Sequence, residues 1–147
     1  MKIKIISVGK KSTKEIASLV ENYQQRLKRS CELLWIFLPT SNIDGESAAI
    51  LKQVGASDYM VLLDQNGNKF SSTDFAATIE QIQNDSTKQL IFVIGGAFGI
   101  NHNVIERSNL VISLSDMVFP HQLVRLILIE QIYRAYTILS GSKYHHE

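Results

Sequence analysis

Short apolar runs alternate with longer segments of helical periodicity, and this alternation constrains the fold more than any other feature of the chain. The apolar runs predict strands at residues 2–8, 32–38, 59–63, 90–94 and 110–114. The segments between and after them predict helices at residues 12–29, 46–53, 72–84, 101–107 and 121–140. Such alternation favours the α/β class, with a largely parallel sheet and ligands bound at the carboxyl ends of its strands. The 147 residues are too few for two ordinary domains, so we expect residues 1–147 to form a single domain.

Local signals predict where some of these elements begin and end. Ser12 and Glu15 have the spacing of a capping box at the start of the first helix. Residues 64–68 predict a turn after the third strand, in which Asp64 bonds to its own loop. Gly141 follows the last helix at a position where a left-handed cap is favoured. The predicted connections are therefore short.

Composition limits the cellular compartment and excludes some kinds of structural site. Cys31 is the only cysteine, so neither an internal disulfide nor a cysteine-rich zinc site can form. The apolar run at residues 126–129 lies between Arg125 and Glu130 and is too short to span a membrane. Lys4 interrupts the apolar start before a signal-peptide core can develop. We therefore expect a cytoplasmic protein that has no membrane segment.

Charge is unevenly distributed along the chain. Residues 1–30 contain eight Lys or Arg residues and only two acidic residues, which gives this segment a net charge of +6. The whole chain carries +1, so the remainder carries −5. A basic segment of this kind forms a surface that faces phosphates, or it is the solvated face of a helix. The sequence leaves both interpretations open.

The segment Ile-Gly-Gly-Ala-Phe-Gly, residues 94–99, follows the fourth predicted strand. Glycines at the end of a strand commonly let a ligand lie against backbone amides. A dinucleotide fingerprint would need a glycine in place of Ile94, and a P-loop would need Lys and Ser or Thr directly after the glycines. A phosphoacceptor role for Asp64 would need carboxylates after the first strand, where Lys10 and Lys11 stand instead. The sequence is therefore a poor fit to a dinucleotide fingerprint, to a P-loop and to a phosphoacceptor domain.

The last predicted helix, residues 121–140, is apolar nearly all round. A helix with so little polar surface in a small domain usually packs against more than its own core. We therefore expect a homodimer that uses this helix at its interface.

Three segments together carry a specific resemblance: residues 94–99, LSDMVFPHQLVRLILIEQIYRAYTILSG at residues 114–141, and the terminal YHHE. With the opening MKIKIISVGK and the later VLLDQNGN, they resemble the ribosomal RNA large subunit methyltransferase H family, a small branch of the SPOUT methyltransferases. The resemblance implies a C-terminal trefoil knot, which ordinary connection rules would not predict. It also implies a homodimer that binds S-adenosylmethionine in the knot.

The resemblance further implies the residues of the site. The cofactor contacts of the family correspond to Leu63, Gly95 and the six consecutive residues Leu114, Ser115, Asp116, Met117, Val118 and Phe119. The glycines of residues 94–99 would then let backbone lie against the cofactor. The family methylates N3 of a pseudouridine in a hairpin loop of 23S rRNA on the assembled ribosome, which makes the ribosome the implied partner.

The implied reaction needs positioning and the removal of one proton. A sulfonium is an activated methyl donor with a neutral leaving group, so neither a metal nor a leaving-group acid is required. His121, at the start of the last helix, is a candidate for the group that removes the proton, or it lines and caps the helix. Arg125 orients a phosphate or a uracil carbonyl, or it pairs with a carboxylate at the dimer interface. Glu130 and Arg134 have the spacing of a structural ion pair.

The C-terminal tail supplies the remaining predicted catalytic residues. In the family the tail folds over the active site with a Tyr-His pair followed by a basic residue, which corresponds here to Tyr144, His145 and His146. His146 stands where the family commonly has Arg or Lys, and a histidine is largely neutral at neutral pH. Adjacent histidines rarely converge on one metal ion, so we expect no metal site there.

Two alternatives to this activity follow from the same residues. The altered tail is compatible with a catalytically impaired module that binds the ribosome or RNA, and such a module would bind the cofactor without transferring a methyl group. The other alternative is a SPOUT enzyme that acts on tRNA. Nucleoside analysis of the methylated RNA separates the ribosomal enzyme from the tRNA enzyme.

Overall fold

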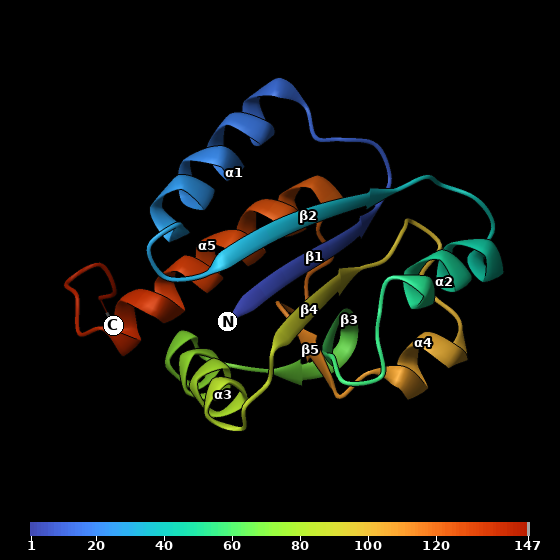
Figure 1. Ribbon diagram of the computed structural model, residues 1–147. Coiled ribbons are helices and arrows are strands. Elements are labelled where there is room, and N and C mark those ends of the chain that lie inside the picture. Colours follow the sequence, from blue (N-terminus) through green and yellow to red (C-terminus); the bar gives the residue numbers. More distant parts are fainter. Residues whose placement is uncertain (147) are drawn as a thin grey trace.

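A parallel five-stranded sheet with the strand order β2-β1-β4-β3-β5 organises the computed structural model, which describes residues 1–146 (Figure 1). The predicted α/β class is therefore confirmed. The elements in chain order are β1 (Lys2–Val8), α1 (Lys14–Leu27), β2 (Glu32–Leu38), α2 (Ile43–Lys52), β3 (Tyr59–Lys69), α3 (Ser72–Asn84), β4 (Gln89–Ile94), α4 (His102–Arg107), β5 (Leu110–Ser113) and α5 (His121–Leu139).

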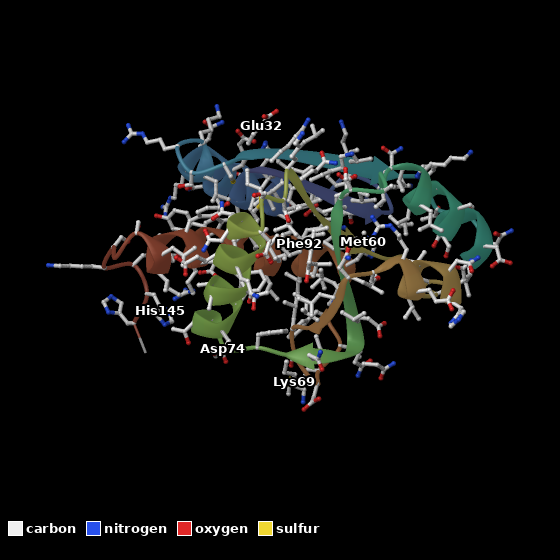
Figure 2. The ribbon with its side chains drawn as sticks, turned by 60° about the horizontal axis from the view of Figure 1, so that its bottom comes forward. Glu32, Met60, Lys69, Asp74, Phe92 and His145 are labelled. Carbon is white, nitrogen blue, oxygen red and sulfur yellow. The ribbon has the colours of Figure 1, made fainter. Side chains whose placement is uncertain are left out.

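The two faces of the sheet bury separate apolar layers. On β1, Ile3 and Ile5 face the layer shared with α1, α3 and α5, whereas Ile6 and Val8 face the layer shared with α2. This division follows from the alternation of side chains along a strand. Phe92 and Met60 lie inside the molecule on opposite faces of the sheet, whereas Glu32, Lys69 and Asp74 lie at its surface (Figure 2).

The predicted capping box at the start of α1 is wrong. Thr13 is the N-cap residue, and its side chain makes no capping hydrogen bond. Instead, the Thr13 N–H donates to Gln122 Oε1 at 2.9 Å, and Ser12 Oγ accepts from Arg125 Nη1 at 3.1 Å. Contacts with α5 have therefore replaced the local cap.

The predicted turn at residues 64–68 is also wrong, because β3 continues through it to Lys69. The register with β5 shifts within this stretch, so that Leu63 and Asn68 both pair with Ile112. Asp64 Oδ2 still accepts a local hydrogen bond from the Asn66 N–H at 3.1 Å, as predicted. A Cβ on Gly67 would lie 2.7 Å from the carbonyl carbon of Ile112, so the backbones of β3 and β5 approach each other closely here.

The last helix packs against α1 and α3 on one face of the sheet. Gly141 follows it with φ of +73°, which confirms the predicted left-handed cap. Within residues 1–146, no helix is both long and apolar enough to cross a membrane.

Candidate functional site

A cavity of about 590 Å³ lies beyond the carboxyl ends of β4 and β5 and beside the middle of β3, at residues 63–65. The predicted cofactor residues that line it are Leu63, Gly95, Leu114, Ser115, Met117, Val118 and Phe119. Three segments far apart in the sequence therefore meet at the edge of the sheet where ligands of α/β proteins usually bind. The lining also includes Gly96, Ala97, Gly99, Ile100, Pro120, His121 and Val124, of which only His121 is among the predicted site residues.

The glycine turn, residues 94–99, forms one wall of this cavity. A Cβ on Gly95 would lie 3.0 Å from Ile100 Cγ2, and one on Gly96 would lie 2.6 Å from Glu46 Oε1. Gly99 has φ of +86°, and its N–H donates to the Gly96 carbonyl at 3.1 Å. The turn therefore needs glycine for close packing and for its backbone conformation, and it leaves backbone groups at the cavity wall.

The cofactor loop, residues 114–120, forms another part of the cavity lining through all of its residues except Asp116. Two hydrogen bonds of Ser115 stabilise the shape of this loop. The Ser115 carbonyl accepts from Ser113 Oγ at 2.9 Å, and Ser115 Oγ accepts from the Met117 N–H at 3.0 Å. Met117 and Val118 are 74% and 76% exposed, so this loop places two large apolar side chains in solvent beside the cavity.

Asp116 is the predicted cofactor residue that does not line the cavity. Its carboxylate forms an ion pair with Lys69 on the surface, and its carbonyl accepts from Gln65 Nε2 at 3.2 Å. These contacts tie the cofactor loop to the end of β3. A cofactor contact by Asp116 stays a prediction.

His121 lines the cavity at the start of α5, as expected for a residue near the reacting groups. A Cβ on Gly9, at the end of β1, would lie 3.3 Å from His121 Nε2, so Gly9 makes room for the imidazole. Burial and the positive charge on Arg125 lower the pKa of His121 below its ordinary value of 6.5. The imidazole is therefore neutral at pH 7 and can accept a proton.

Arg125 is completely buried and faces the interior of its own chain. Its Nε donates to Ser7 Oγ at 2.7 Å and its Nη1 to the Lys10 carbonyl at 2.7 Å, while its guanidinium carbon lies 4.8 Å from the centre of the Phe37 ring. Burial lowers the pKa of the guanidinium. Within residues 1–146 no carboxylate pairs with it. Arg125 therefore holds the start of α5 against β1, and its predicted contact with RNA would require this packing to open.

The C-terminal tail follows the end of α5 (Figure 1), whereas the cavity is lined by His121 and Val124 at the start of this helix. The helix has 19 residues, which corresponds to a length of about 28 Å. The tail therefore does not reach the cavity of its own chain, because the rigid helix α5 lies between them. That Tyr144, His145 and His146 fold over an active site stays a prediction.

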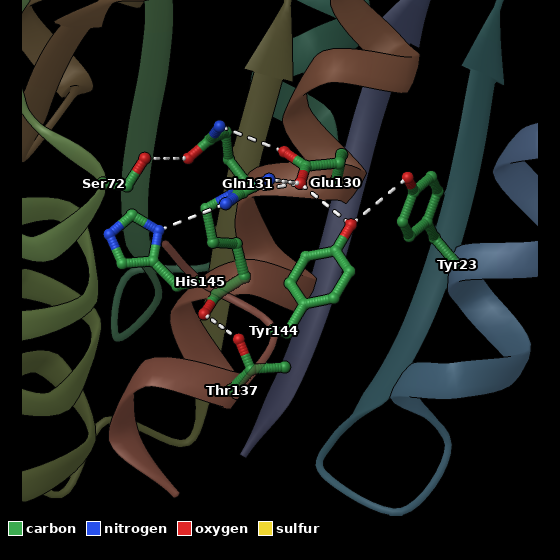
Figure 3. Close-up of polar contacts among 8 residues, drawn as sticks. Tyr23, Ser72, Glu130, Gln131, Thr137, Tyr144 and His145 are labelled. Atoms are coloured by element: carbon green, nitrogen blue, oxygen red, sulfur yellow. Dashed lines mark hydrogen bonds and ion pairs between the residues drawn. The ribbon is translucent and has the colours of Figure 1, made fainter. Parts of the chain in front are cut away.

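The tail is nevertheless held in place by a polar and aromatic network (Figure 3). The Tyr144 ring lies 4.8 Å from that of Tyr133, and its hydroxyl donates to Glu130 Oε1 at 3.3 Å. Glu130 also accepts from Arg134 Nη2 at 2.6 Å, which confirms the predicted ion pair. His145 Nδ1 lies 3.1 Å from Arg134 Nη1.

Tyr144 and His146 differ in their surroundings. The hydrogen bond with Tyr23, burial and the charge of Glu130 raise the pKa of the Tyr144 hydroxyl, so it stays protonated at neutral pH. His146 is exposed. Among residues 1–146, no group of three or more His, Cys, Asp or Glu side chains is arranged to hold a metal ion.

Comparison with known proteins identifies the family of the chain. The family described as "Predicted SPOUT methyltransferase" matches residues 1–145. The chain is 42% identical to Ribosomal RNA large subunit methyltransferase H of Christiangramia forsetii, over 99% of both chains. Proteins of the same name in Acholeplasma laidlawii and Nitratidesulfovibrio vulgaris are 39% and 35% identical, over 99% of this chain and 99% and 98% of theirs. The chain therefore belongs to the SPOUT methyltransferase family.

Proposed function

We propose that this protein transfers the methyl group of S-adenosylmethionine to N3 of a pseudouridine in a hairpin loop of 23S rRNA on the assembled ribosome. The cavity at the carboxyl ends of β4 and β5, beside residues 63–65 of β3, is the observation that carries the proposal. The relatives named above are large-subunit rRNA methyltransferases and match the chain over its length, which supports the substrate class. Work on ribosomes would place the protein in the cytoplasm.

The residues of the cavity fit the proposed cofactor. Its volume, about 590 Å³, falls within the range of pockets that enclose ligands of this size. Apolar side chains from Leu63, Leu114 and Val124 would cover an adenine ring, and the backbone of residues 95–96 and 115–118 would supply hydrogen bonds to its polar edge and to the ribose. The trefoil knot of the family would bring these segments together.

Bound cofactor would supply an activated methyl group with a neutral leaving group. The chain's own task is then to orient donor and acceptor and to accept the imide proton. The His121 imidazole is the candidate proton acceptor, because it is neutral and lines the cavity. Arg125 acts through His121, by holding α5 in place and by disfavouring the imidazolium form.

We further propose that the protein works as a homodimer in which the tail of the partner covers the cavity. The tail of the same chain is one helix length away. Next to the cavity, Met117, Val118 and Leu123 expose apolar side chains that a second copy of the chain would cover. The partner's tail would then bring its Tyr-His pair to the pseudouridine that receives the methyl group.

Mixed dimers test this arrangement. One variant, Gly95→Leu, blocks the cavity, because a side chain there meets Ile100. The other, Tyr144→Ala with His145→Ala, disables the tail. Each variant alone is expected to be inactive, and an equal mixture is expected to regain about a quarter of wild-type activity, because half of the dimers carry one intact composite site. No recovery in a mixture shown to contain mixed dimers would contradict the shared site.

A further inference from the structure

Glu46 is a buried carboxylate that the proposed chemistry does not yet use. It lies in the first turn of α2 and is 2% exposed. One oxygen, Oε2, accepts from the Ser41 N–H at 2.8 Å. The other, Oε1, is buried and has no hydrogen-bond partner among residues 1–146, and no Lys, Arg or His of this part of the chain forms an ion pair with the carboxylate.

The unpartnered oxygen points at the glycine turn. A Cβ on Gly96 would lie 2.6 Å from Glu46 Oε1, and Gly96 itself lines the cavity. The carboxylate is therefore separated from the cavity by the backbone of a residue that has no side chain. A glycine here lets the carboxylate approach the cavity more closely than any other residue would.

Two neighbours of Glu46 hold Asn101, which lies two residues beyond the glycine turn. Ser47 Oγ accepts from the Asn101 N–H at 3.0 Å, and Asp44 Oδ1 accepts from Asn101 Nδ2 at 3.1 Å. The first turn of α2 thus supports the turn between β4 and α4 from behind. Ser47 does so without a charge, which makes it a natural control for Glu46.

A buried carboxylate without a cation is costly, and the N-terminal end of α2 offsets only part of this cost. A positive charge in the adjoining cavity would offset more of it. The proposed cofactor carries such a charge on its sulfonium, and methyl transfer converts this sulfonium to a neutral thioether. The negative charge would therefore favour the cofactor over its own product.

We propose, on the basis of the cofactor proposed above, that Glu46 is a positioning residue whose buried negative charge makes the cavity prefer S-adenosylmethionine to S-adenosylhomocysteine. Glu46 lies behind Gly96 and attracts the sulfonium across the glycine turn. Loss of the positive charge on methyl transfer weakens this attraction and so promotes release of the product.

Calorimetric titration of Glu46→Gln with each ligand separately tests the proposal. Glutamine keeps the shape and the acceptor toward Ser41 but removes the charge. Affinity for S-adenosylmethionine is expected to fall about tenfold, while affinity for S-adenosylhomocysteine changes less than about twofold. Equal changes for the two ligands, or no change, would overturn the proposal. Ser47→Ala removes a neutral support of the loop between β4 and α4, and it is expected to weaken the binding of both ligands equally.

Two further measurements separate the possible failures. If Glu46→Gln does not fold, Glu46→Asp is used instead, because it keeps the charge. The ratio of its affinities for S-adenosylmethionine and S-adenosylhomocysteine is expected to resemble that of the wild type. A ratio of one would overturn the proposal. If the wild-type protein binds neither ligand, the proposed cofactor is wrong and the role of Glu46 is wrong with it. If the wild type binds both and Glu46→Gln leaves their ratio unchanged, only the role of Glu46 is wrong.

Discussion

Arg125 Nε donates a hydrogen bond to Ser7 Oγ at 2.7 Å, and this contact joins residues 118 positions apart in the sequence. It fastens the start of α5, where His121 lines the cavity, to the first strand. Ser12 and the Lys10 carbonyl complete the set of acceptors. The cavity therefore depends on contacts between the two ends of the chain.

Replacement of Arg125 by lysine is expected to destabilise the protein by about 2–4 kcal/mol, because an ammonium group cannot bond to Ser7, Lys10 and Ser12 together. Urea denaturation measures this change. Arg29→Lys, at an exposed position, is the matched control and is expected to leave stability unchanged. Equal midpoints for the two variants would show that the buried contacts contribute nothing.

The stability of the protein is expected to fall as the pH is lowered from 7 to 5, in part because of His121. Its folded-state pKa is below the ordinary value of 6.5, so the unfolded chain binds the proton more readily and acid favours unfolding. His121→Gln removes this contribution. The free energy of unfolding, measured by denaturant titration at several pH values, should therefore decrease less steeply in the variant. Parallel pH curves would contradict a lowered pKa.

Gly67→Ala is expected to cost about 1–3 kcal/mol of stability, because its methyl group would lie against the backbone of Val111 and Ile112, which cannot move aside easily. Thermal or urea unfolding gives the value. Gly55→Ala is a suitable control, since its methyl group would meet only the Asp58 carboxylate, at 3.1 Å. Unchanged stability of Gly67→Ala would mean that the backbones of β3 and β5 do not approach each other as closely as described.

Reversal of charge at Lys10 and Lys11 tests the basic N-terminal segment. Both side chains are exposed, and Lys10→Glu with Lys11→Glu is expected to weaken ribosome binding at least about tenfold and to reduce its salt dependence. Affinity for S-adenosylmethionine should not change. Lys52→Glu with Lys88→Glu changes the net charge equally at exposed positions elsewhere. If both double variants bind ribosomes equally, the segment has no special role.

Regular elements with local signals were predictable from the sequence. The bounds of β1, β2 and α3 are confirmed as predicted, and in α3 the start is set locally, since Ser71 Oγ accepts from the Asp74 N–H at 3.1 Å. The end of β3 was not predictable, because residues 64–69 have the composition of a turn and become a strand only by pairing with β5. Non-local pairing overrides local preference there.

The site was predictable in part, from the rule that ligands bind at the carboxyl ends of parallel strands and from the resemblance. Leu63, Gly95 and the cofactor loop were expected together, and all of these residues except Asp116 line one cavity. The interior position of Arg125 and the unpartnered oxygen of Glu46 were not, because their surroundings come from segments that only the fold brings near. The place of the tail depends on the direction and length of α5, which the order of motifs does not reveal.

Methyl transfer from labelled S-adenosylmethionine to ribosomes that lack the modification tests the central claim most directly, with free 23S rRNA and tRNA assayed in parallel and the products identified by mass spectrometry of nucleosides. We expect methylpseudouridine with assembled ribosomes only. Methylated tRNA, or cofactor binding without transfer to any of these RNAs, would contradict it.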